Sequence, residues 1–258
     1  MQCLFQIPEF TELLELENKK NSFFCHCKKI INYKEKDLTK QILNLTHYTH
    51  TMFFKNDKST DPQDALEFLI KLICGNPLLQ SLFGIPLKVT ISCTNCNTVL
   101  KSTSQTVFNL SLNDLKTSLV DKMKCPYCNQ SNLQAHKKCT LKTPPPYLLI
   151  DCEKGNEHNT LNIINKFKSI ENGPYKYQLI GIILHTGSYN YGHYISLVKE
   201  KLKNKWFLCN DLNVMSLENL NKHHFSYFQM FSPRVLVYIQ TQIKKDCRDK
   251  NKNNHSTT

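Results

Sequence analysis

The pattern of apolar and polar positions divides the chain into a helical first third and a β-rich remainder. Residues 1–16 carry apolar side chains interleaved with glutamates, which predicts a short helical segment interrupted at Pro8. From residue 85 onward, short apolar runs rich in β-branched and aromatic residues predict strands instead. The expected strands cover residues 87–92, 106–112, 147–152, 177–185, 193–199, 205–209 and 234–240.

A capped amphipathic helix is expected in the second half of the helical region. Asp61 suits the position that receives the first free backbone amides, and Pro62 suits the first helical position. Gly75 is typical of a helix end. Leucines and isoleucines fall on one side of this helix, whereas Asp64 and Glu67 share the polar side with a lysine one turn further on. Taken alone, the pattern indicates no more than a well-capped surface helix.

Composition restricts the class of protein. The chain has 258 residues, of which 40% are hydrophobic, and only 7 glycines, as in an ordinary globular protein. No segment approaches the roughly 20 apolar residues that span a bilayer. Residues 1–16 have neither the basic start nor the small-residue cleavage site of a signal peptide. We therefore expect a protein of the cytoplasm or nucleus that has no membrane partner.

The charge balance is strongly basic. Lysine and arginine total 33 against 21 acidic residues, a net charge of +12, and such a field attracts nucleic acids or acidic partners. The lysines alternate with asparagine rather than with the aromatic side chains on which bases stack, so a solvated surface is the favoured interpretation. Residues 241–258 contain too few apolar side chains to offset the entropy of ordering, and we expect them to form a disordered polar tail.

Four of the twelve cysteines form two Cys-x-x-Cys pairs, Cys93 with Cys96 and Cys125 with Cys128. In a reducing compartment such pairs indicate a metal site rather than disulfides. Both pairs lie among turn-forming residues, and four thiolates complete a closed tetrahedral Zn²⁺ site, which has a structural role. The segment between the pairs is longer than the roughly 15–20 residues of compact zinc ribbons, so it should contain structure of its own.

The sequence Gly192-His193-Tyr194 contains the strongest candidate for a general base. A strand can present the imidazole of His193 to an open cleft, and a polar side chain on the next strand, Asn210, can bond to the second ring nitrogen. Asp211 follows directly. This arrangement is typical of the histidine half of a cysteine-protease site. Taken alone, His193 is also compatible with an ordinary surface histidine.

Four stretches together resemble the catalytic domain of the ubiquitin-specific proteases, a family of papain-like cysteine deubiquitinases. Residues 63–68 are similar to the family's glutamine-aspartate-alanine box, and the two cysteine pairs are similar to its zinc-binding fingers. Residues 145–150 resemble the proline-led strand that enters the palm. Residues 182–194 and 206–214 resemble the histidine box and its partner strand. A chance cysteine protease or zinc ribbon would not carry all four in this order.

The resemblance implies an α+β, papain-like cysteine protease fold of the ubiquitin-specific protease type. Residues 1–240 would form the domain, with a partial helical thumb at 1–84, zinc-ribbon fingers at 85–145 and a β-rich palm at 146–240. The implied function is to bind ubiquitin or ubiquitin conjugates and to hydrolyse the bond after the C-terminal glycine of ubiquitin.

The resemblance also implies roles for individual residues. His193 would be the general base, Asn210 would orient it, and Asp211 would be an adjacent acidic helper. Asp64 and Glu67 resemble acids that hold the basic tail of ubiquitin in its channel. Glycine leaves room for an extended chain in the narrow slot that admits the terminal diglycine. The lining of that slot would be Gly187, Gly192 and Tyr194.

The family's nucleophile box, glycine-asparagine-threonine-cysteine followed by an aromatic residue, matches no stretch of the sequence. Residues 1–10 instead resemble the helix that follows the box. Cys3 lies in an apolar run and is interpreted as a core residue, while Cys25 and Cys27 fall in an unmatched segment.

Three interpretations remain open. The favoured one is that the chain begins at an internal methionine, as a fragment or a wrongly assigned gene start would. The second is an inactive protein that only binds ubiquitin. The third and least favoured is a zinc-ribbon protein that binds nucleic acid, which salt-dependent binding would reveal.

Overall fold

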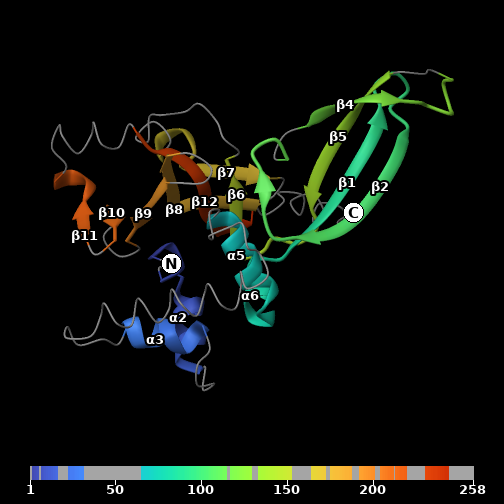
Figure 1. Ribbon diagram of the computed structural model, residues 1–258. Coiled ribbons are helices and arrows are strands. Elements are labelled where there is room, and N and C mark those ends of the chain that lie inside the picture. The colour runs from blue at the N-terminus through green and yellow to red at the C-terminus, as the bar shows by residue number, and fades with distance from the viewer. Residues whose placement is uncertain are drawn as a thin grey trace, which may run out of the picture.

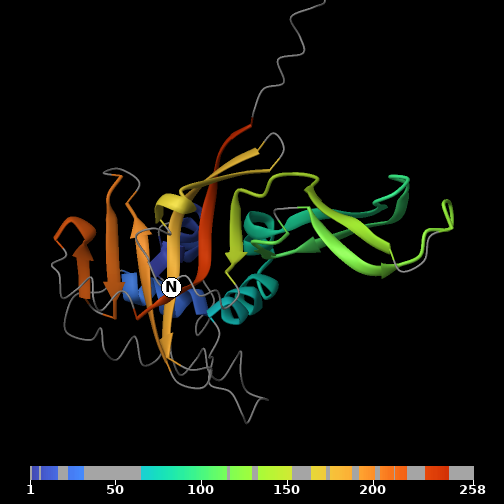
Figure 2. The same ribbon diagram turned by 90° about the horizontal axis from the view of Figure 1, so that it is seen from above.

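The computed structural model contains two β-sheets and a group of helices, and one sheet extends from the body of the molecule as a long arm (Figures 1 and 2). We call the larger sheet the palm sheet and the arm the fingers sheet. The structure describes residues 2–5, 7–16, 23–31, 65–114, 117–129, 133–152, 164–172, 175–187, 192–200, 204–211, 213–219 and 230–243.

The palm sheet has eight strands, in the order β11-β10-β9-β8-β12-β6-β3, with β7 paired to β8 outside this path. Its pairs are antiparallel except for β3 with β6, which is parallel. The strand β12 ends three residues beyond the expected domain boundary at residue 240. The palm strands are β3 (Leu110–Ser111), β6 (Tyr147–Asp151), β7 (Ser169–Asn172), β8 (Tyr175–Gly187), β9 (Gly192–Lys199), β10 (Trp206–Asn210), β11 (Asn213–Ser216) and β12 (Ser232–Ile243).

The central strands of the palm sheet are buried on both faces. Alternate residues of a strand point to opposite sides of the sheet. On β6, Tyr147 and Leu149 belong to the apolar cluster that includes the helices, whereas Leu148 and Ile150 belong to a second cluster on the other face. Such strands read as continuous apolar runs, which is why the sequence predicted most of them.

The fingers sheet has four antiparallel strands in the order β2-β1-β5-β4. It is a thin arm, and nearly all of the edge strand β2 is exposed. The strand expected at residues 106–112 is wrong as a single element. The chain finishes β2 at Val107, leaves the fingers and joins the palm sheet as β3. The fingers strands are β1 (Ile85–Cys93), β2 (Val99–Val107), β4 (Ser118–Met123) and β5 (Leu133–Leu141).

The helices pack on the palm sheet and at its junction with the fingers (Figure 1). The expected break at Pro8 separates α1 from α2. The expected cap residues Asp61 and Pro62 lie outside the described residues. The helix α6, which was not predicted, begins where the Asn76 side chain accepts hydrogen bonds from two backbone amides. The helices are α1 (Gln2–Phe5), α2 (Pro8–Leu16), α3 (Phe23–Ile31), α5 (Ala65–Cys74), α6 (Pro77–Phe83) and the 3-10 turn η2 (Leu217–Asn219).

Within the described ranges, no single helix has the length and apolar character needed to cross a membrane. Only α5 and α6 taken together meet that test, and the two are bent by 119° at the break between them.

Candidate active site and metal-binding cluster

The side chains of His193 and Asn210 contact each other across neighbouring strands of the palm sheet. His193 lies near the start of β9 and Asn210 at the end of β10, which pairs with β9 in antiparallel fashion. The Nε2 atom of His193 is 2.6 Å from Oδ1 of Asn210. An amide oxygen can only accept a hydrogen bond, so Nε2 of the neutral ring carries the proton. The other ring nitrogen, Nδ1, is therefore left as the acceptor.

Two further groups surround the His193 ring. The Asp211 carboxylate lies 3.8 Å from Nε2, and its side chain is 77% exposed. Asp211 adopts a left-handed backbone conformation with φ of 50°, at the turn between β10 and β11. The buried ring of Phe231 meets the imidazole edge-on, with 6.3 Å between centroids. Sequence reasoning missed Phe231, because an apolar residue between expected strands carries no chemical signal.

The β8–β9 hairpin presents the three residues expected to line a slot. Gly187 has φ of 107°, a conformation that side-chain-bearing residues rarely adopt, so glycine is required there by the backbone. A Cβ atom on Gly192 would lie 2.1 Å from Nε2 of His185 and 2.4 Å from the backbone oxygen of Thr186. Glycine at 192 is thus required by its own neighbours. His185 lies within the histidine box, but the resemblance implied no role for it there.

Tyr194 joins this hairpin to α5. Its ring lies against His185, with 4.4 Å between centroids. Its hydroxyl accepts a hydrogen bond from the backbone amide of Ala65, the first residue of α5, at 3.4 Å. A cavity of about 120 Å³ lies beside this contact, and its lining includes Phe68 and Ser196. The histidine strand is therefore in direct contact with the helix that contains residues 65–68 of the expected glutamine-aspartate-alanine box.

Of the two acids expected in the tail channel, the structure describes one. Asp64 lies outside the described residues. Glu67 is on α5, where its side chain is 59% exposed and forms an ion pair of 2.7 Å with Lys71 one turn along the helix. Glu67 therefore lies on the same helix as Ala65, the residue that contacts Tyr194.

Cys3 and Cys27 are core residues, as expected for Cys3, whereas Cys25 is partly exposed. Burial raises the pKa of the Cys3 thiol to about 11 and that of Cys27 to about 12. The sulfur of Cys3 packs against Gly181 of β8, where an added Cβ would approach it to 3.0 Å. A thiol with so high a pKa is a weak source of thiolate. Within the described part of the chain, no thiol lies within hydrogen-bonding distance of His193.

The four expected metal ligands meet at the far end of the fingers sheet. The sulfur atoms of Cys93, Cys96, Cys125 and Cys128 all lie within 4.8 Å of one another. The separation is 3.7 Å between Cys93 and Cys128 and 3.6 Å between Cys96 and Cys125. Tetrahedral zinc with Zn–S bonds of about 2.3 Å places its sulfurs about 3.8 Å apart. The donor set and its spacing therefore fit a zinc ion.

Each cysteine pair is built on a similar turn. The residue after the second cysteine is asparagine in both pairs, and Asn97 and Asn129 have φ of 58° and 54°. Asparagine enters this left-handed region more readily than most residues because its short side chain bonds locally. In the first turn, the backbone amide of Asn95 donates a hydrogen bond to the Cys93 sulfur at 3.4 Å.

Comparison with known proteins agrees with this architecture. The ubiquitin carboxyl-terminal hydrolase family matches residues 1–238. Over 258 aligned positions the chain is 24% identical to ubiquitin carboxyl-terminal hydrolase 25 of Arabidopsis thaliana, covering 80% of this chain and 38% of that protein. It is 46% identical over 85 residues to ubiquitin carboxyl-terminal hydrolase 47 of Drosophila melanogaster, covering 29% of this chain and 6% of that protein.

Among solved structures, the SAGA Ubp8/Sgf11/Sus1/Sgf73 DUB module bound to ubiquitin aldehyde has a similar fold. The TM-score is 0.65 at 20% identity, over 94% of this chain and 66% of that one. The chain therefore belongs to the ubiquitin carboxyl-terminal hydrolase family, and the predicted α+β fold of the ubiquitin-specific protease type is confirmed. It spans less than half the length of the two curated relatives described above.

Proposed function

We propose that this chain binds ubiquitin and supplies the histidine half of the cysteine-protease chemistry that hydrolyses the bond after ubiquitin's C-terminal glycine. The observation that carries the proposal is the 2.6 Å contact between His193 Nε2 and Asn210 Oδ1. This contact favours the tautomer in which Nδ1 can take a proton from a thiol, and a histidine so oriented activates a nucleophilic cysteine.

In this mechanism His193 is the general base and Asn210 orients its ring. The sulfur of a cysteine from the family's nucleophile box, which no stretch of this chain matches, would attack the carbonyl carbon of the last glycine as its proton passes to His193, and His193 would then give that proton to the leaving amine. Water releases the acyl group in a second step of the same kind. The Asp211 carboxylate, 3.8 Å from Nε2, stabilises the positive imidazolium between these steps.

The hairpin and α5 are proposed to hold the tail of ubiquitin. Gly187, Gly192 and Tyr194 would line the slot for the terminal diglycine. Asp64 and Glu67 would attract basic residues of the tail, and because Glu67 is paired with Lys71, a basic tail residue would have to compete with that lysine. A paired but exposed carboxylate contributes modestly, so we expect Glu67 to tune affinity rather than to determine it.

Zn²⁺ is the proposed ion for the four-cysteine cluster. Four thiolates leave no open coordination position, so the ion would be structural and would hold the end of β1 to the turn after β4. We expect the protein to act in the cytoplasm or nucleus, where reducing conditions keep these thiols available to the metal.

A second candidate function is ubiquitin binding without hydrolysis. It is favoured by the finding that, among the residues that the structure describes, no thiol lies within hydrogen-bonding distance of His193. The two candidates share the ubiquitin-binding surfaces and differ only in whether a nucleophile reaches Nδ1.

Two measurements test the proposal. Calorimetric titration with ubiquitin should show binding that Glu67→Lys weakens. Glu218→Lys is the matched control, because Glu218 is equally exposed and also pairs with a lysine at 2.7 Å. Once a segment that carries the family's nucleophile box is added before Met1, the chain should form a covalent adduct with a ubiquitin probe that has a thiol-reactive C-terminus, and His193→Ala should abolish that adduct. Binding without an adduct would favour the second candidate, and absence of binding would overturn both.

A further inference from the structure

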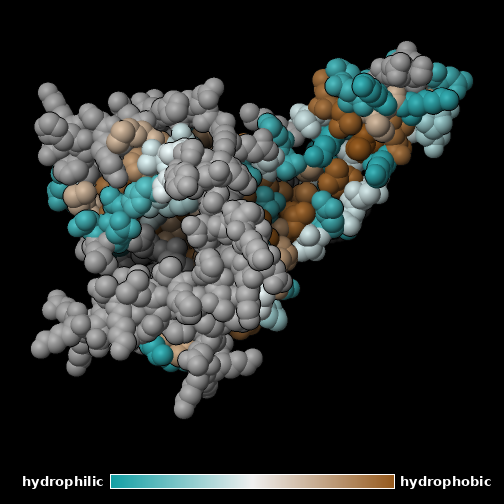
Figure 3. All heavy atoms as spheres, viewed as in Figure 1, coloured by the Kyte–Doolittle hydropathy of each residue, from teal (hydrophilic) through white to brown (hydrophobic). Residues whose placement is uncertain are grey.

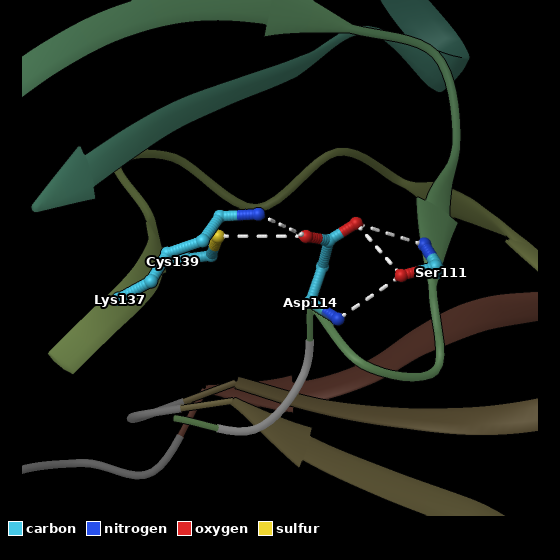
Figure 4. Close-up of polar contacts among 4 residues, drawn as sticks. All are labelled: Ser111, Asp114, Lys137 and Cys139. Atoms are coloured by element: carbon cyan, nitrogen blue, oxygen red, sulfur yellow. Dashed lines mark hydrogen bonds and ion pairs between the residues drawn. The ribbon is translucent and has the colours of Figure 1, made fainter. Parts of the chain in front are cut away.

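A cluster of four side chains connects the fingers sheet to the palm sheet. Its members are Ser111, Asp114, Lys137 and Cys139 (Figure 4). We infer that Asp114 is a positioning residue, which fixes the angle of the fingers to the palm and so sets the grip on the globular body of ubiquitin. The part of this inference that concerns ubiquitin rests on the proposed function.

One oxygen of the Asp114 carboxylate is bound to the palm side. Its Oδ2 accepts hydrogen bonds from the backbone amide of Ser111 at 3.1 Å and from the Ser111 hydroxyl at 3.0 Å. The hydroxyl oxygen in turn accepts from the Asp114 amide at 3.2 Å. Ser111 belongs to β3, which pairs with β6 of the palm. The carboxylate is therefore held in one orientation relative to the palm sheet.

The other oxygen is bound to the fingers side. Oδ1 accepts a hydrogen bond from Nζ of Lys137 at 3.2 Å and another from the Cys139 thiol at 3.7 Å. Both residues are on β5, two positions apart, and therefore on the same face of that strand. A single carboxylate thus bridges the two sheets, with one oxygen for each.

The bridge can fix the angle of the fingers because it lies away from their apolar base. At the base of the fingers, Leu87 and Leu141 pack in one apolar cluster with Leu110 and Leu148 of the palm. Apolar contacts are non-directional, so they anchor the base without fixing its angle. Lys137 lies four residues beyond Leu141 along β5, which at the rise of a strand is roughly 13 Å. A charge-assisted hydrogen bond at that distance from the base restricts rotation of the fingers sheet relative to the palm sheet.

The bridge is charged under ordinary conditions. Burial alone would raise the pKa of Asp114, but the hydrogen bonds from Ser111 and the neighbouring Lys137 ammonium outweigh it and hold that pKa below its ordinary value. The hydrogen bond to Asp114 raises the pKa of Lys137. Both groups therefore remain ionised at neutral pH, and the contact between Asp114 and Lys137 is maintained there.

The angle between the fingers and the palm matters because the fingers carry exposed apolar side chains. Apolar side chains are exposed along the fingers (Figure 3), and Val99, Leu119 and Tyr127 are each more than half exposed. A globular partner that touches these side chains while its tail lies at the β8–β9 hairpin must fit between the fingers and the palm. The affinity for such a partner therefore depends on the angle that Asp114 holds.

The test compares Asp114→Asn and Lys137→Gln with Asp121→Asn. Asp121 is the matched control, because it is also a fingers aspartate but accepts its hydrogen bond from Gln134 within the fingers sheet, at 2.9 Å. The first measurement is the distance distribution between spin labels on unnatural amino acids at Val99 and Val214, both exposed, without ubiquitin. The second is the dissociation constant for ubiquitin.

We expect Asp114→Asn and Lys137→Gln to broaden the distance distribution and to weaken ubiquitin binding by about three- to tenfold, and Asp121→Asn to do neither. The double variant should be no worse than either single one, because both remove the same contact. An unchanged distance distribution in Asp114→Asn would show that Asp114 does not fix the angle between the fingers and the palm. A broadened distribution with unchanged affinity would show that this angle does not affect ubiquitin binding. If the wild-type protein binds no ubiquitin, the proposed function is refuted. The distance measurement would still show whether Asp114 fixes the angle between the fingers and the palm.

Discussion

The imidazole of His185 occupies the space that a side chain on Gly192 would need. An added Cβ would lie 2.1 Å from its Nε2 atom, closer than real Cβ contacts come. The same ring lies against Tyr194, so His185 contacts both neighbours of His193. The glycine before the candidate base is therefore required by packing within the β8–β9 hairpin, in addition to any requirement of a substrate.

Substitution of this glycine should destabilise the protein. Gly192→Ala forces either the His185 ring or the hairpin backbone to move, and overpacking of this kind costs about 1–3 kcal/mol. Chemical unfolding should show a lower free energy of unfolding than in wild type. Gly75→Ala is the control, because its nearest heavy atom is 3.4 Å from the new Cβ. Equal losses in the two variants would contradict the steric explanation.

Removal of the Asn210 amide should release the His193 ring. In wild type, Nε2 donates to the amide oxygen at 2.6 Å, so long-range ¹⁵N correlation spectra should show one dominant tautomer. In Asn210→Ala the two ring nitrogens should move toward averaged shifts. Asn213→Ala alters an exposed asparagine on the neighbouring strand β11 and should leave the spectrum unchanged. An unchanged His193 spectrum in Asn210→Ala would show that the amide does not set the tautomer.

Loss of one cluster cysteine should release the proposed metal. Wild-type protein should contain one zinc ion per chain by elemental analysis, because the four sulfurs form a single closed set. Cys125→Ser should lose the ion and lower the melting temperature by more than about 10 °C, since metal binding at such sites contributes directly to folding. Cys74→Ser changes an exposed cysteine outside the cluster and should alter neither value. Folded wild-type protein free of zinc would overturn the assignment.

Alkaline pH should lower the free energy of unfolding through the buried thiol of Cys3. The pKa of Cys3 is about 11 in the folded protein against an ordinary value of 9.0, because burial disfavours the thiolate. The stabilising contribution of this neutral thiol is fully present below pH 9 and is lost as the pH rises toward 11. The unfolding free energy should therefore fall more steeply with pH in wild type than in Cys3→Ala, by up to about 1.4 kcal/mol per pH unit. Parallel pH profiles would contradict the burial of this group.

The sequence predicted the palm far better than the fingers. The palm strands β6, β8 and β12 are buried on both faces and read as apolar runs. The fingers strands β2, β4 and β5 carry polar side chains on a thin arm, and their pattern alone does not distinguish them from loops. The sequence analysis did not predict α6, although Asn76 and Pro77 carry the cap signal, because a helix of 7 residues is too short to show a helical repeat.

Local sequence patterns were sufficient to recognise the family and to name the residue types of the candidate site. The cysteine pairs, the histidine box and the glycine positions are local patterns, and each is recognisable without a fold. Which atoms meet is a property of the three-dimensional arrangement. The sequence predicted that Asn210 would bond to His193, whereas the choice of Nε2, the packing of His185 on Gly192 and the bridge from Asp114 to Lys137 depend on how strands and sheets lie against one another. Such contacts arise from strand register and from the packing of whole sheets, which local sequence patterns specify only weakly.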